Sequence, residues 1–145
     1  MKLQEENYTF DYLPGTQIYL YQHKKMFRTN TDTALLGHFM KVRKKDTVLD
    51  IGTNNGALLL YANIHEPKQL IGVDIQHDAC ELARYNMEYH SIHNVTIVEG
   101  DVLTMDLPRV SCVVCNPPYF KVDDIEKVNT NLSIGTARHE MGPGS

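Results

Sequence analysis

The feature that most constrains this chain is a short apolar run that leads directly into a loop with a glycine at each end. Thr-Val-Leu-Asp-Ile occupies 47–51, Gly-Thr-Asn-Asn-Gly follows at 52–56, and residues 57–64 have the character of a helix. A short apolar run bounded by turn residues predicts a buried strand. A strand that enters a helix through a glycine turn is typical of parallel α/β sheets. The sequence therefore predicts an α/β domain built around this unit.

Strands and helices continue to alternate beyond the loop, each element being short and rich in apolar residues. We predict strands at 69–74, 95–98 and 110–115, and a helix at 77–90. Upstream of the loop, 16–21 is rich in β-branched and aromatic residues and predicts a strand. An apolar stripe at helical spacing predicts a helix over 31–40, with Thr31 or Asp32 as its cap.

The apolar pattern fades after Tyr119, where the sequence becomes polar. We therefore predict a Rossmann-like parallel sheet that ends after its fourth strand, in a single domain over residues 1–140. Residues 141–145 (Met-Gly-Pro-Gly-Ser) resemble a cloning remnant. An incomplete sheet exposes the edge of its last strand, which predicts self-association through that edge.

Acidic residues lie at or just beyond the ends of the three predicted strands at 47–51, 69–74 and 95–98. Asp50 lies near the end of the first, Asp74 ends the second, and Asp101 follows the third. The carboxyl ends of parallel strands meet at one edge of the sheet, where ligands bind in such folds. Asp74 is placed to accept hydrogen bonds from ribose hydroxyls, and Asp101 from an adenine amino group.

The loop itself indicates which ligand that edge holds. Its form is Asp-x-Gly-x-x-x-Gly, with Gly52 for the tight turn, Asn54 inside the loop, and Gly56 for close approach of the backbone to the ligand. A dinucleotide site has a Gly-x-Gly-x-x-Gly cluster that cradles pyrophosphate, which Asp50 would repel. A cofactor with a cationic sulfonium and an amino-acid end fits better, so we predict S-adenosylmethionine.

Asn116-Pro117-Pro118-Tyr119 follows the fourth predicted strand and supplies acceptors for a planar amine. The side-chain oxygen of Asn116 and the carbonyl of Pro117 can each accept one amine hydrogen, and Tyr119 offers a flat face for stacking. An exocyclic amine is a poor nucleophile because its lone pair is delocalised, so orientation toward the methyl donor is the task. The motif predicts methylation of such an amine.

Composition sets limits on the class of protein. No apolar run is long enough to span a bilayer and the first residues do not form a signal peptide, which predicts a cytoplasmic protein without a membrane partner. Cys112 and Cys115 lie on a predicted strand with side chains on opposite faces, so no metal site is predicted. The net charge of −4 weighs against a nucleic-acid partner, although 23–28 and 41–45 are basic.

Taken together, these motifs resemble the class I methyltransferases that act on amino nitrogens. Within that group the sequence most resembles the bacterial tRNA(Val) adenine methyltransferases, through 22–36, the 50–56 loop, 116–120 and 137–140. The resemblance implies methyl transfer from S-adenosylmethionine to the exocyclic amine of the adenine beside the anticodon, with tRNA as partner. It also implies that the segment from Phe27 to Thr33 closes over the cofactor.

Several alternatives stay open at this point. A protein glutamine methyltransferase uses the same loop on a side-chain amide, and guanine or DNA adenine are further acceptors. A chain that lacks the later strands of the family sheet can also bind the cofactor without catalysing the reaction.

Overall fold

Strand β3 (Thr47–Ile51) lies at the centre of a parallel sheet, as its apolar sequence predicts. In the computed structural model the strand order is β5–β4–β3–β6–β7, and each neighbouring pair is parallel. The structure describes residues 5–26, 29–116, 126–128 and 138–141. The other strands of this sheet are β4 (Gln69–Asp74), β5 (Val95–Glu99), β6 (Cys112–Cys115) and β7 (Arg138–Met141).

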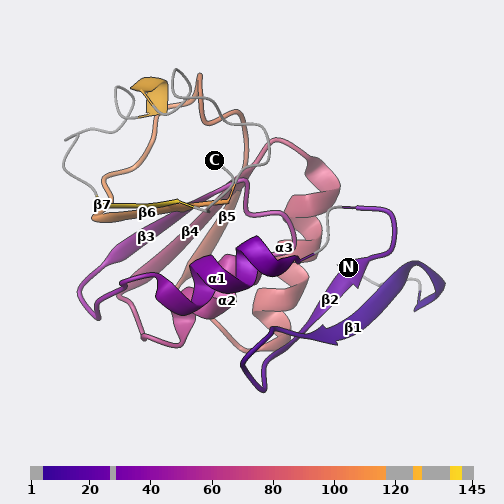
Figure 1. Ribbon diagram of the computed structural model, residues 1–145. Coiled ribbons are helices and arrows are strands. Elements are labelled where there is room, and N and C mark those ends of the chain that lie inside the picture. Colours follow the sequence, from indigo (N-terminus) through magenta and orange to yellow (C-terminus); the bar gives the residue numbers. More distant parts are fainter. Residues whose placement is uncertain (1–4, 27–28, 117–125, 129–137, 142–145) are drawn as a thin grey trace.

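Three helices cover one face of this sheet (Figure 1). They are α1 (Thr31–Phe39), α2 (Ala57–Asn63) and α3 (His77–Tyr89). The cap of α1 differs from the prediction, because the side chain of Asn30 accepts the hydrogen bond from the Thr33 N–H. None of the described helices is long and apolar enough to cross a membrane.

Two apolar clusters fill the space on either side of the sheet. Cys112 packs with the helices on one face, whereas Cys115 packs on the other face with Val102, Leu107 and Val110 from the segment after β5. The prediction that the two thiols point in opposite directions is therefore confirmed, and both are free. Burial of both faces explains why these strands are continuous apolar runs.

The α/β fold class is confirmed, but the sheet does not end after its fourth strand. β7 pairs in parallel with β6, with Cys112 opposite Arg138 and Cys115 opposite Met141. The edge that was predicted to be exposed on the fourth strand is therefore covered within the same chain. Met141, assigned from sequence to a terminal remnant, is the last residue of β7.

A separate antiparallel hairpin precedes the main sheet, formed by β1 (Tyr8–Tyr12) and β2 (Tyr19–His23), after a short 3-10 turn at Glu5–Asn7. β2 begins later than the predicted strand at 16–21, and β1 was not predicted. The hairpin docks on α3 through Asn86, whose side chain bonds to both backbone groups of Tyr21 at 2.8 and 3.0 Å.

Candidate functional site

The carboxyl ends of the central strands bring the predicted site residues into one row. Ile51 is in register with Val73 on one side and with Cys115 on the other. The residues that follow these three, Gly52, Asp74 and Asn116, therefore lie at the same level, at the carboxyl ends of the strands. Predictions made from three separate parts of the sequence thus converge on a single edge.

The two glycines of the loop have different tasks. Gly52 has a φ of +69°, and a Cβ built on it meets nothing within 4 Å, so it borders open space. Gly56 has a φ of +86° and lies buried, where a Cβ would come within 2.9 Å of Cε of Met87 on α3. Gly56 therefore meets a positive φ and close packing against α3, and its approach to the ligand stays a prediction from sequence.

Asp74 fixes the shape of the loop. Its carboxylate accepts hydrogen bonds from the backbone N–H of Asn54 and of Gln76, both at 2.9 Å. Asn54 is held at a φ of +52°, which is uncommon for a residue with a side chain and occurs at sites where the surroundings impose it. No described group bonds to Oδ1 of Asn54, although this atom is buried.

Asp50 is buried below the loop, with only 1% of its surface exposed. Neither carboxylate oxygen has a hydrogen-bond partner among the described residues. Burial raises the pKa of Asp50 to about 8; the nearby Thr53 hydroxyl opposes this rise, and the negative charge of Asp74 adds to it. A buried acid without a partner is costly, because desolvation disfavours its charged form. A cation beside it would remove that cost.

Asp101 lies near the outer end of this row. Asp74 is in register with Glu99, and the Gly100 N–H donates to the Asp74 carbonyl at 2.9 Å. Asp101 then begins a turn in which its carboxylate accepts from the Leu103 N–H at 2.9 Å. It is partly exposed, and its assignment as the acid that contacts adenine stays a prediction.

Thr33 and Asn116 are brought into direct contact. Nδ2 of Asn116 donates to Oγ1 of Thr33 at 3.0 Å, and Oγ1 of Thr33 donates in turn to Oδ1 of Asn30 at 3.2 Å. Thr33 is buried, whereas Asn116 is partly exposed. The amide nitrogen of Asn116 is thus directed into the protein, which leaves its oxygen as the available acceptor.

Three predicted site residues cannot be placed in this geometry. Phe27, predicted to close over the cofactor, and Pro117 and Tyr119 of the amine-binding motif lie outside the described residues. Their roles stay predictions from sequence.

The carboxylates and the open backbone at this edge of the sheet fit S-adenosylmethionine. A buried carboxylate without a partner at Asp50 suits a cationic group, and the open space above Gly52 allows close approach to the backbone. Asp74 keeps acceptor capacity for hydroxyl groups, since each carboxylate oxygen carries one backbone hydrogen bond.

Comparison with known families agrees with this arrangement. The model of the methyltransferase small domain matches residues 18–144. The chain belongs to this family.

Curated relatives of this methyltransferase domain carry two kinds of name. The tRNA1(Val) (adenine(37)-N6)-methyltransferase of Vibrio parahaemolyticus is 34% identical over 113 residues, which are 76% of this chain and 46% of that protein. The release factor glutamine methyltransferase of Vibrio cholerae is 35% identical over 96 residues, or 64% of this chain and 32% of that protein. The chain spans about half the length of the first of these relatives.

Solved structures support the fold. The Methanocaldococcus jannaschii tRNA m1G37 methyltransferase superposes with a TM-score of 0.75 at 20% identity, covering 88% of this chain and 40% of that one. At that identity the likeness extends to the arrangement of strands and helices.

Two residues of this methyltransferase domain were missed from sequence. Ile75 directly follows Asp74 and is 67% exposed. A large apolar side chain therefore lies beside the carboxylate that is predicted to bind ribose. Gln22 is buried, and its Oε1 accepts from the Thr29 N–H at 2.7 Å and from Nδ2 of Asn55 at 3.5 Å. The signal for Ile75 was an apolar residue at a predicted strand end, where polar residues are usual.

Proposed function

We propose that this domain transfers a methyl group from S-adenosylmethionine to an exocyclic amino nitrogen, and that the acceptor is an adenine of tRNA. The observation that carries the proposal is the fixed orientation of Asn116, whose amide nitrogen donates to Thr33. S-adenosylmethionine, when bound, supplies an electrophilic methyl group on a sulfonium. Asp50 and Asp74 are the residues that would hold its cationic and hydroxyl groups.

Asn116 acts on the acceptor amine. Its side-chain oxygen accepts a hydrogen bond from the amine, which orients the nitrogen lone pair toward the methyl donor. A new N–C bond forms as the S–C bond breaks, and the amine proton, made acidic by the attack, passes to solvent. No strong base is needed beside Asn116, because orientation is the limiting requirement.

A second acceptor is the side-chain amide of a protein glutamine, whose nitrogen is delocalised in the same way. The relative named as a release factor glutamine methyltransferase favours this candidate. A relative from Methanocaldococcus jannaschii, named as a putative protein N5-glutamine methyltransferase, matches 77% of this chain at 28% identity. The tRNA adenine relative of Vibrio parahaemolyticus is 34% identical over a similar share, 76%. That higher identity is our reason to place tRNA first.

The test is radiolabelled methyl transfer, with unmodified tRNA and a release-factor protein offered in the same reaction. We expect label in the tRNA and its loss in the Asn116→Ala variant. A matched control, Asn63→Ala at the end of α2, should leave transfer unchanged. Label in the protein alone would establish the glutamine alternative, and label in neither would contradict the proposal.

A further inference from the structure

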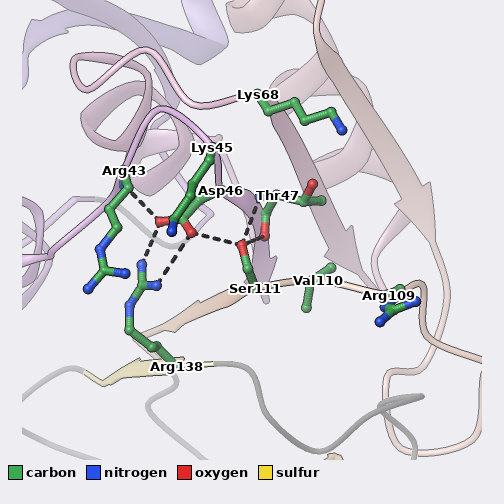
Figure 2. Close-up of a pocket in the computed structure, with 9 residues that line it drawn as sticks. All are labelled: Arg43, Lys45, Asp46, Thr47, Lys68, Arg109, Val110, Ser111 and Arg138. Atoms are coloured by element: carbon green, nitrogen blue, oxygen red, sulfur yellow. Dashed lines mark hydrogen bonds and ion pairs between the residues drawn. The ribbon is translucent and has the colours of Figure 1, made fainter.

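A cavity opens at the opposite edge of the sheet from the candidate site, where β3, β6 and β7 begin (Figure 2). Its volume is about 600 Å³, which lies in the range of ligand pockets. Five of the nine residues that line it are basic and one is acidic. The charged residues are Arg43, Lys45, Asp46, Lys68, Arg109 and Arg138.

The one acid is occupied by internal bonds. Asp46 is buried and accepts hydrogen bonds from Nη2 of Arg138 at 2.5 Å, the Arg43 N–H at 2.7 Å and Oγ of Ser111 at 2.8 Å. Burial alone would raise its pKa, but these hydrogen bonds hold the pKa of Asp46 below its usual value. The carboxylate of Asp46 is therefore neutralised by Arg138, and this ion pair holds the start of β7 in place.

The other four cations have no such partner. Within the described ranges, no carboxylate forms an ion pair with the side chains of Arg43, Lys45, Lys68 or Arg109, all of which are exposed. The neighbouring Lys44, in contrast, pairs with Glu66 at 3.6 Å and does not line the cavity. Positive charge is thus concentrated at one pocket of a chain whose net charge is −4.

We propose that this pocket binds phosphate groups of an RNA strand. The guanidinium of arginine can donate two parallel hydrogen bonds to phosphate oxygens, and the ammonium of lysine adds a compact positive charge. A pocket lined by positive charges also attracts anions electrostatically. The pocket goes beyond the proposed function because it lies across the sheet from Asp74 and Asn116, a separation of about 15 Å along strands of five residues. A folded RNA can reach both edges.

The test is binding of a fluorescein-labelled oligouridine across a series of KCl concentrations. In the Lys45→Gln/Lys68→Gln double variant we expect roughly tenfold weaker binding at low salt and a salt slope smaller by about 1.4, as for two lost contacts to single-stranded phosphate. Both side chains are exposed, so the fold and the affinity for S-adenosylmethionine should not change. If the wild-type protein failed to bind S-adenosylmethionine, that result would count against the proposed function and not against the RNA pocket.

The matched control is Lys24→Gln/Lys25→Gln, which removes the same charge just beyond β2 on the hairpin. We expect wild-type affinity and slope from it. Equal weakening in both double variants, or no weakening in the pocket variant, would overturn the proposal. A second arm uses inorganic pyrophosphate: pocket-dependent binding of pyrophosphate without pocket-dependent binding of RNA would overturn the assignment to an RNA strand.

Discussion

The side-chain amide of Asn116 donates to the hydroxyl of Thr33 across 83 positions of sequence, at 3.0 Å. The hydroxyl is held in turn by Asn30, which also caps α1. Two hydrogen bonds therefore link the start of this helix to Asn116, the residue predicted to bind the acceptor amine. Thr33 is assigned to the cofactor by resemblance, and from this contact we propose that it also positions Asn116.

Replacement of Thr33 by valine keeps the shape of the side chain but removes the acceptor for Asn116. We expect the turnover rate of methyl transfer to fall about tenfold, the loss of roughly one hydrogen bond. The dissociation constant for S-adenosylmethionine should stay unchanged. Thr31→Val, at an exposed position of the same helix, is the control. A raised cofactor dissociation constant with an unaltered rate would return Thr33 to its first assignment.

Burial of Asp50, whose pKa is about 8, predicts that cofactor binding releases a proton. The free carboxyl is mainly protonated below that pH, whereas a nearby cation favours the carboxylate. Affinity should therefore rise with pH, roughly tenfold between about pH 7 and about pH 9. Calorimetry in buffers of different ionisation enthalpy measures the proton. Asp50→Asn should lack this release, and equal release from both proteins would argue against Asp50 as the source.

The two loop glycines should respond differently to alanine. Gly52→Ala strains a positive φ in open space, a cost of about 1–2 kcal/mol. Gly56→Ala carries the same strain and also displaces Cε of Met87, the end of a flexible side chain, for a total of about 2–3 kcal/mol. Urea unfolding measures both. The order should reverse for affinity, since only Gly52 borders the open space. Equal unfolding costs would show that contact with α3 does not constrain Gly56.

Arg138 is expected to fasten β7 to the sheet. Arg138→Ala leaves the buried Asp46 without its ion partner, at a cost of about 2–4 kcal/mol in the free energy of unfolding. The comparison is Lys44→Ala, which breaks the exposed pair with Glu66 and should change stability by less than about 0.5 kcal/mol. Similar values for the two variants would mean that the pair with Asp46 contributes little.

Most of the central sheet could be predicted from the sequence. The strands at 47–51 and 69–74 match their predicted bounds, since buried parallel strands are continuous apolar runs. β7 has no such signal, because its first three residues, Arg-His-Glu, are polar. The strand is specified by pairing with β6 and by the bond from Arg138 to Asp46. The hairpin did carry a signal, because Tyr8, Phe10 and Tyr12 alternate in β1.

The candidate site was predictable to a similar extent. Aspartates at the ends of predicted strands indicated which edge of the sheet holds the site. The carboxyl ends of parallel strands lie together at that edge. Contacts between distant segments could not be predicted in this way. Thr33 meets Asn116 only because α1 packs over the sheet, and the basic pocket gathers residues from four separate segments. Such contacts depend on tertiary packing, which local periodicity does not encode.

The most direct measurement is a calorimetric titration of the protein with S-adenosylmethionine, beside its Asp74→Asn and Asp78→Asn variants. Asp74 shapes the loop through Asn54 and Gln76, whereas Asp78 lies exposed on α3. We predict saturable binding by the wild type and by Asp78→Asn, and binding at least about tenfold weaker for Asp74→Asn. Absence of binding to the wild type, or equal affinity in all three proteins, would contradict a cofactor site at this edge of the sheet.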